Sequence, residues 1–366
     1  GMRFWIVGGG TGGHVYPGLA VVQALQAIEP DAALTWVGGK SGMERALVER
    51  VGLPFVDVPA GGVHGVGLGR MTRNTIRLFQ GLGVALRALA WEQPDALLTT
   101  GGYVSVPVAL AAWIRRVPMM IFLPDVEPAL SVKFIARLAA RIGVTVEDSR
   151  KYLPERKVEV TGYPLRDEIA RWDRHSGREA LGVPATAPVL LVFGGSRGAR
   201  SINRAVLANL PALLEEVEII HISGQLDWDE VAEAHAQLSD VQRVHYHTFP
   251  YLHEEMGAAL AAADLVVSRA GASVLGEFPY FELPAVLVPY PYAWRYQKVN
   301  AQWLADRGAA IVVEDAALKE TLVSTVCALI ADSDRRRVMK EAARRLARPD
   351  ASRKLADMMR RLGKEN

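Results

Sequence analysis

The sequence contains only one cysteine, Cys327, which lies in an apolar helical stretch. A lone cysteine cannot form an intrachain disulfide, so the fold must depend on buried apolar side chains. No run of about 18 apolar residues could span a bilayer, and no signal-peptide pattern is visible. We therefore expect a cytoplasmic protein, soluble or bound peripherally to a membrane.

Excess charge of one sign and metal-binding clusters are also missing. The formal net charge is +2, which gives no general case for a nucleic-acid partner. No His and Cys residues have the spacing of a zinc site. Asp227 and Asp229 have a D-x-D spacing known from metal-dependent enzymes, but both suit the start of a helix over residues 230–238 better. We expect no metal, no cofactor and no nucleic acid.

Short apolar, β-rich runs alternate with amphipathic helical segments along the whole chain. The predicted strands cover residues 3–7, 34–37, 96–100, 119–122, 142–145 and 158–160, then 189–193, 217–222, 243–249, 265–268, 285–288 and 310–313. Apolar strands separated by helices predict parallel sheets covered on both faces. We expect an α/β fold of two Rossmann-like parallel-sheet domains facing across a cleft, at residues 1–163 and 164–349. A C-terminal helix within residues 350–366 should pack back on the first domain.

Each half begins with a strand followed by a glycine-rich turn. The turns are Gly8–Gly13 and Gly194–Ala199. Glycine lets the backbone approach an anion closely, and the start of a helix offers free N–H groups. Two such turns predict an enzyme that handles phosphate groups in both domains.

The first turn satisfies G-x-G-x-x-G, the fingerprint of dinucleotide binding, so a nicotinamide-dependent oxidoreductase is one alternative. That fingerprint also requires an Asp or Glu about 20 residues later to bind a ribose. The second strand ends in Trp36-Val37-Gly38-Gly39-Lys40, without an acid. The sequence therefore favours a loop that holds a diphosphate, and His14 at the start of the next helix could act as a general base.

The second half supplies polar residues for a nucleotide. Ser196, with Arg197 or Arg200, suits a diphosphate. Glu277, in the helix after the strand 265–268, could accept two hydrogen bonds from a ribose diol. Gln297 could bind sugar hydroxyls.

Residues 72–92 combine large apolar side chains with arginines, and Trp113–Arg116 adds an aromatic ring and two more arginines. Apolar surface ringed by arginine suits an anionic membrane leaflet. The alternative is that the apolar side chains belong to the core and the arginines to a solvated face. The candidate membrane residues are Arg73, Arg77, Phe79, Trp113 and Arg116.

Several segments together resemble the MurG family of GT-B glycosyltransferases, over nearly the whole chain. The matching segments are Gly8–Gly18 with His14 and Pro17, Thr100–Ser105, Val160–Arg166, Gly194–Ala199, Arg269–Glu277 and Gln297–Asn300. The resemblance implies inverting transfer of N-acetylglucosamine from UDP-N-acetylglucosamine to lipid I, a lipid-linked acceptor, in peptidoglycan synthesis. It also implies a metal-independent enzyme on the inner face of the cell membrane.

The resemblance assigns roles by position. His14 is the first candidate for the catalytic base and Asp125 the second. The implied donor-binding residues are Arg166, Ser196, Arg197, Leu252, Ala272, Ser273, Val274, Glu277 and Gln297. The implied acceptor-binding residues are Thr11, Gly12, Gly13, Gly101, Gly102 and Tyr103.

The sequence departs from the family pattern where sugar and acceptor should meet. The family's His-Glu-Gln-Asn stretch is Phe122-Leu123-Pro124-Asp125 here. The family's His and Asp upstream of the glutamine are Tyr292 and Trp294, and the glutamine of Gly-Gly-Ser-Gln-Gly is Arg197. Two further alternatives therefore stay open: a GT-B enzyme with another lipid or natural-product acceptor, and a nucleotide-binding protein without turnover.

Overall fold

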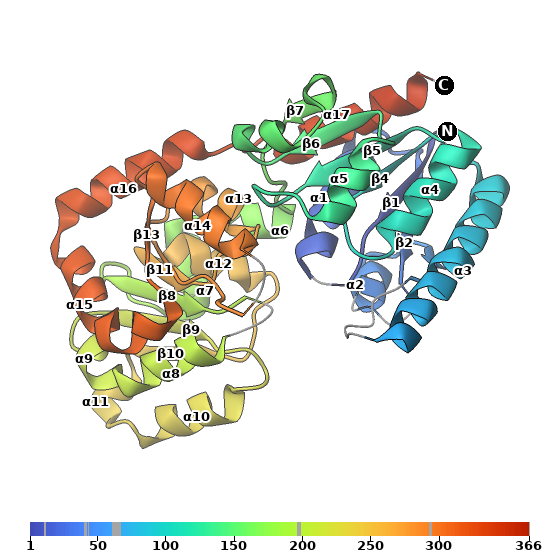
Figure 1. The fold of residues 1–366 in the computed structure, drawn as a ribbon. Coiled ribbons are helices and arrows are strands. Elements are labelled where there is room, and N and C mark those ends of the chain that lie inside the picture. The colour runs from blue at the N-terminus through green and yellow to red at the C-terminus, as the bar shows by residue number, and fades with distance from the viewer. Residues whose placement is uncertain are drawn as a thin grey trace. The chain divides into compact units, whose positions relative to one another are not determined.

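The computed structural model describes residues 1–10, 12–39, 42, 44–60, 67–195, 199–292 and 295–365. The chain divides into two compact units: unit 1 is Gly1–Arg166 with Pro349–Asn366, and unit 2 is Asp167–Arg348. Each unit is an α/β structure on its own parallel sheet (Figure 1). The predicted fold class, two parallel-sheet α/β domains, is confirmed.

Unit 1 is built on a seven-stranded parallel sheet of order β3-β2-β1-β4-β5-β6-β7, as far as the described residues go. Its central strands are apolar on both faces because helices cover both; Phe4, Trp5 and Ile6 are all fully buried. The strands are β1 (Arg3–Val7), β2 (Ala33–Gly38), β3 (Phe55–Asp57), β4 (Ala96–Thr99), β5 (Met119–Leu123), β6 (Arg141–Val144) and β7 (Val158–Val160).

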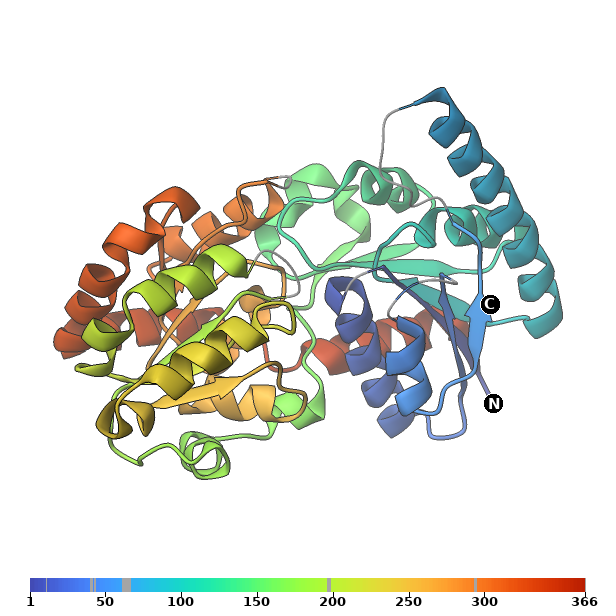
Figure 2. The ribbon, with the colours of Figure 1, turned by 90° about the horizontal axis from the view of Figure 1, so that it is seen from below.

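The helices of unit 1 include one from the far end of the chain. They are α1 (Gly12–Ile28), α2 (Glu44–Arg50), α3 (Leu68–Glu92), α4 (Ser105–Arg115), α5 (Leu130–Ala136) and α17 (Ala351–Lys364). Helices α3 and α4 lie side by side and pack together, and α17 packs on α1 (Figure 1). The first turns of α3 project beyond the other helices of this unit (Figure 2). No described helix is both long enough and apolar enough to cross a membrane.

Unit 2 has a six-stranded parallel sheet of order β10-β9-β8-β11-β12-β13 in its described part. The strands are β8 (Val189–Phe193), β9 (Glu218–Ile222), β10 (Tyr246–Phe249), β11 (Leu265–Ser268), β12 (Ala285–Leu287) and β13 (Ala310–Val312). The helices are α6 (Asp167–Ala170), α7 (Arg174–Leu181), α8 (Arg200–Ala208), α9 (Leu210–Leu214), α10 (Trp228–Gln237), α11 (Asp240–Arg243), α12 (Glu255–Ala262), α13 (Val274–Tyr280), α14 (Tyr296–Asp306), α15 (Leu318–Ala331) and α16 (Ser333–Leu346).

The strand order reverses once in each sheet. From β1 the chain first builds outward through β2 and β3, and then continues on the other side of β1 with β4. In unit 2 the same reversal lies between β8 and β11. Ligands of open parallel sheets bind outside the carboxyl ends of the strands at such a point. In unit 1 the loops after β1 and β4 lie at this point, and in unit 2 the loops after β8 and β11.

The structure differs from the sequence-based expectation in three places. The edge strand β3 was not predicted, because its three residues are too short for a periodicity. The amphipathic segment 204–216 is divided between two helices: α8 ends before Asn209, since Pro211 starts α9 and cannot continue a helix. The strand predicted over 243–249 begins only at Tyr246, because Ser239 and Gln242 form a capping box that starts α11.

Candidate active site

The reversal point of unit 1 brings two glycine loops into contact. Gly10, Gly101 and Gly102 have φ values of +93°, +112° and +94°, which side chains rarely adopt. A Cβ on Gly102 would lie 2.4 Å from the carbonyl oxygen of Gly9, so the two loops meet through backbone alone. The candidate acceptor residues Gly101 and Gly102 are thereby packed against the first loop. Thr11 lies outside the described residues.

His14 stands at this contact, in the first turn of α1. Its Nδ1 lies 3.2 Å from the carbonyl oxygen of Gly9. Because a carbonyl oxygen only accepts, the neutral ring carries its proton on Nδ1 and keeps Nε2 as the basic nitrogen. The imidazole lies directly over Gly101, where a Cβ would come within 3.2 Å of Nε2. The Thr100 hydroxyl donates to the carbonyl oxygen of His14 and so holds the same turn.

The second candidate base, Asp125, follows β5 and is half-buried. Burial lowers the pKa of His14 below its ordinary value, while the negative charge of Asp125 opposes that shift. The two candidate bases are therefore close enough to interact electrostatically. Phe122 and Leu123, where the family has His and Glu, are buried in β5 and belong to the core.

Sequence reasoning missed the group that supports the first loop, Glu44. This carboxylate is fully buried and accepts hydrogen bonds from the backbone N–H groups of Gly39 at 2.8 Å and Gly10 at 3.3 Å. A Cβ on Gly9 would lie 2.2 Å from its Oε1. An acid in the first turn of α2 just after the Gly38-Gly39 pair was the available signal. Its other partner, Gly10, lies 34 positions away, beyond the reach of a local pattern.

At the reversal point of unit 2, the turn between β11 and α13 offers unpaired backbone donors. The N–H groups of Ala272 and Ser273 donate to no group within the described residues. The next amides turn inward, as Val274 donates to the carbonyl oxygen of Gly271 at 3.1 Å. Glu277 follows in α13 and is half-buried. Two free N–H groups and a carboxylate on one turn suit a phosphate with a neighbouring diol.

Helix α14 holds this turn from behind. The Gln297 side-chain oxygen accepts from the N–H groups of Tyr290 at 2.9 Å and Ala270 at 3.3 Å, which leaves its NH₂ group as the donor for a ligand. Buried Asn300 donates to the carbonyl oxygen of Ala270 at 3.1 Å. Arg269 is also buried and forms an ion pair with Asp315 at 2.7 Å, so its charge is neutralised inside unit 2.

The other loop at this point follows β8. Gly194 packs on Ala199, since a Cβ there would lie 2.3 Å from the Ala199 Cβ. Ser196 and Arg197 lie outside the described residues. Arg200 opens α8, and its Nε lies 3.6 Å from Oδ1 of Asp227.

A buried chain of hydrogen bonds continues from Asp227. Asn203 donates to Oδ2 of Asp227 at 2.8 Å, and its Oδ1 lies 2.7 Å from Nε2 of His221. His221 Nδ1 lies 2.6 Å from the Tyr246 hydroxyl. Burial lowers the pKa of His221 to about 3, so the ring is neutral with its proton on Nε2. This network, which sequence reasoning missed, ties the start of α8 to strands β9 and β10.

Asp227 precedes α10 but makes no cap hydrogen bond with its side chain. Among the described residues, no three His, Cys, Asp or Glu side chains are grouped so as to hold a metal ion. Asp227 thus stands at the start of α10 and takes part in the buried network.

Leu252 and Arg166 are the remaining candidate donor residues, and Tyr292 and Trp294 are the departures from the family pattern upstream of Gln297. Leu252 is half-buried after β10, at the far edge of the sheet of unit 2. Tyr292 is exposed and packs edge-on against Tyr290 at 5.7 Å between ring centroids. Arg166 belongs to unit 1, where its guanidinium lies 4.4 Å from the ring centroid of Tyr16. Trp294 is not among the described residues.

Comparison with known proteins identifies the family to which the chain belongs. Residues 4–144 match the glycosyltransferase family 28 N-terminal domain, and residues 189–357 match the C-terminal domain of the same family. The chain belongs to glycosyltransferase family 28. The two matches include the loops at both reversal points.

Curated family 28 relatives match along the full chain. A Roseiflexus sp. protein is 43% identical, over 99% of this chain and 95% of its own length. A Desulforudis audaxviator protein is 38% identical, over 99% and 98%. Both are named UDP-N-acetylglucosamine–N-acetylmuramyl-(pentapeptide) pyrophosphoryl-undecaprenol N-acetylglucosamine transferase. The crystal structure of Acinetobacter baumannii MurG is 25% identical with a TM-score of 0.76, covering 99% of this chain and all of that one.

Proposed function

We propose that this chain transfers N-acetylglucosamine from UDP-N-acetylglucosamine to undecaprenyl-pyrophosphoryl-N-acetylmuramyl-pentapeptide, with inversion at the anomeric carbon. The observation that carries the proposal is the match, end to end, with curated relatives named for that reaction. The glycine loops at the reversal point of each sheet support it, because ligands of open parallel sheets bind at such points.

The proposed chemistry is a single displacement. An acceptor hydroxyl oxygen attacks the anomeric carbon, the bond from that carbon to the diphosphate oxygen breaks, and UDP leaves. His14 Nε2 takes the hydroxyl proton, because Nδ1–H is committed to the carbonyl oxygen of Gly9. Asp125 stabilises the imidazolium that forms, since its charge already favours the protonated ring.

Unit 2 is proposed to hold the donor. The free N–H groups of Ala272 and Ser273 bind phosphate oxygens, Glu277 binds the ribose hydroxyls and the Gln297 NH₂ group binds the sugar. Ser196 and Arg197 are proposed to complete the phosphate site, and Leu252 the nucleoside site, whereas the Val274 N–H is already used by the carbonyl oxygen of Gly271. Oriented N–H groups and arginine stabilise the charge of the leaving diphosphate, so we propose that no metal is needed.

The surface of α3, α4 and α5 is proposed to rest on the inner face of the cell membrane. Large apolar side chains on this surface are exposed to solvent. They are Leu68, Met71, Ile76 and Phe79 of α3, Trp113 and Ile114 of α4, and Leu130 and Phe134 of α5. Leu82, Val84 and Leu86 instead pack on the core, so the exposed apolar side chains of α3 proposed to face the membrane lie in its first half. Arg73, Arg77 and Arg116 are exposed beside the apolar side chains. An apolar surface with basic residues and no acid suits anionic lipid.

The direct test is turnover with labelled UDP-N-acetylglucosamine and a panel of acceptors. We expect the sugar to appear on the muramyl lipid with release of UDP. Transfer only to a lipid lacking the muramyl group, or to a soluble natural product, would assign the chain to another reaction of the fold. UDP binding without transfer to any acceptor would make it a binding protein.

A further inference from the structure

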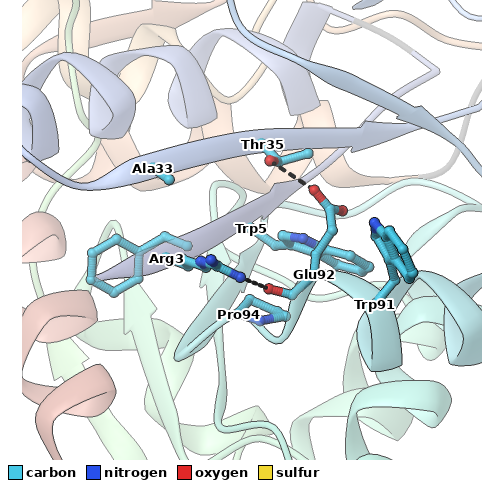
Figure 3. Close-up of a pocket in the computed structure, with 8 residues that line it drawn as sticks. Arg3, Trp5, Ala33, Thr35, Trp91, Glu92 and Pro94 are labelled. Carbon is cyan, nitrogen blue, oxygen red and sulfur yellow. Dashed lines mark hydrogen bonds between the residues drawn. The ribbon is translucent and has the colours of Figure 1, made fainter. Parts of the chain in front are cut away.

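A hollow at the amino-terminal edge of the unit 1 sheet takes no part in the proposed transfer. Its walls include Arg3 and Trp5 of β1, Thr35 of β2, and Trp91 and Glu92 at the end of α3 (Figure 3). Its volume is about 290 Å³, near the lower limit of ordinary small-molecule sites. The glycine loops follow the carboxyl ends of these strands, so the hollow lies at the opposite edge of the sheet.

Two buried polar atoms beside the hollow lack partners. Trp5 is 1% exposed, and its Nε1–H donates to nothing within the described residues. Glu92 Oε2 also accepts from no described group, and Oε1 has one long contact, 3.4 Å from the Thr35 hydroxyl. Buried donors and acceptors are nearly always paired, directly or through water. A donor and an acceptor therefore lie beside the hollow, and a guest molecule that uncovers them could satisfy both.

The rim of the hollow carries an uncovered aromatic ring. Trp91 is 88% exposed, although it is among the largest apolar side chains in the unit. The Arg3 guanidinium is anchored by a 2.8 Å bond from Nη1 to the backbone oxygen of Glu92. One positive and one negative group at the same opening disfavour both simple anions and simple cations.

We propose that this hollow is a second saccharide site, with room for one sugar ring. A hydroxyl group can accept from Trp5 Nε1–H and donate to Glu92 Oε2 at the same time, which neither a pure donor nor a pure acceptor can do. The C–H face of the ring stacks on the Trp91 indole. A neutral polyhydroxyl ligand also matches the balanced charges of Arg3 and Glu92.

Entry of the sugar requires the Glu92 carboxylate to move. Both unpartnered atoms are buried in this conformation, and Figure 3 shows the carboxylate beside the Trp5 indole and the Thr35 hydroxyl. The single long contact to Thr35 is the only described hydrogen bond of that carboxylate. A ligand hydroxyl can therefore displace it without breaking a strong interaction.

The test is a titration of full-length protein labelled with ¹⁵N at its tryptophan indoles, using free N-acetylglucosamine and methyl glucoside as probes. The indole N–H resonances of Trp5 and Trp91 should shift and saturate, with the other six of the eight tryptophans as internal references. Loss of a peak in Trp91→Ala and in Trp5→Phe assigns the two resonances. If Trp5→Phe does not fold, sugar binding is measured from the Trp91 resonance in the wild type and in the Glu92→Gln variant.

Trp91→Ala should weaken sugar binding by about tenfold or more, as removal of an aromatic anchor usually does. Glu92→Gln should weaken it too, and Trp113→Ala, which removes an exposed indole of the same unit, should leave the affinity unchanged. If neither sugar shifts the Trp5 or Trp91 resonance, or if Trp91→Ala binds as tightly as wild type, the hollow holds only solvent and the proposal fails. Because the titration needs no turnover, its result is independent of the proposed transferase activity.

Discussion

At the scale of single residues, the proposed reaction centre depends on keeping His14 neutral. Burial lowers its pKa from the ordinary 6.5, so the ring stays a base at a pH where an exposed histidine is already protonated. As the pH is lowered, kcat should therefore fall with a midpoint below pH 6.5, which is the acid limb of its pH profile. Asp125→Asn should move that midpoint lower still, because it removes a negative charge that raises the pKa. Measurement of kcat against pH for wild type and Asp125→Asn checks both statements.

His14→Ala should lower kcat by about 10²–10⁴-fold and remove the acid limb. The Kd for UDP should not change, because His14 lies in unit 1. If Asp125→Asn costs much more kcat than His14→Ala, Asp125 is the base.

Glu277 is the residue we expect to bind the ribose. Glu277→Ala should weaken UDP binding by about 1–3 kcal/mol, the usual cost of a lost charged hydrogen-bond partner. Calorimetric titration measures this, with Glu320→Ala, an exposed acid of α15 in the same unit, as the matched control. Equal UDP affinity in Glu277→Ala and wild type would remove Glu277 from the donor site.

Residue types and local position were enough to single out His14, Glu277 and Gln297 from the sequence. They could not identify Glu44 or Asn203, because each of these side chains has a hydrogen-bond partner in a distant segment. Gly10 lies 34 positions from Glu44, and Asp227 lies 24 from Asn203. No local periodicity encodes such partners.

At the scale of elements, the two loops of unit 1 depend on glycine at their contact. Gly102→Ala would place a Cβ 2.4 Å from the Gly9 oxygen at a φ of +94°. We expect it to separate the loops, lower the melting temperature and greatly reduce transfer, with UDP affinity retained in unit 2. Gly69→Ala is the control, because it lies in α3 with nothing within 4 Å and should be neutral or slightly stabilising. Transfer at the wild-type rate in Gly102→Ala would show that the loop contact is dispensable.

The exposed apolar and basic side chains in the first half of α3 predict that the protein binds an anionic membrane. Each arginine near an anionic surface contributes about 1 kcal/mol, and salt screens the attraction. The protein should sediment with anionic vesicles, dissociate from them at high salt and not sediment with neutral vesicles. Replacement of Arg73, Arg77 and Arg116 with Gln should abolish sedimentation without changing UDP affinity.

The same charge change on and after α16, at Arg335, Arg345 and Arg348, is the control and should leave vesicle binding intact. Wild-type protein that does not sediment at low salt would make this face an ordinary solvated surface, and a soluble acceptor would become the better hypothesis.

At the scale of the whole molecule, the donor charge is proposed to be neutralised without metal. The described residues contain no metal-binding group, and Asp227 is committed to Asn203 and Arg200. Transfer should therefore proceed at an unchanged rate in EDTA. Loss of transfer in EDTA with recovery on adding Mn²⁺ would contradict the mechanism.

The sequence by itself determined the fold class, the extent of most strands and the two glycine turns. These features are local: apolar runs of strand length, and glycine where the backbone must approach an anion or its neighbour. The resemblance to known transferases rested on the same local motifs.

Only the tertiary structure decided what those elements do together. Strand order is set by pairing between distant segments, and it alone places the carboxyl end of β1 beside that of β4 and the carboxyl end of β8 beside that of β11. It also decided which part of α3 is core, since burial depends on what covers a helix face: Leu82 packs inside, whereas Phe79, three residues earlier, stands 66% exposed. The hollow between β1, β2 and α3 follows from the same cause, because its walls meet only after the sheet has formed.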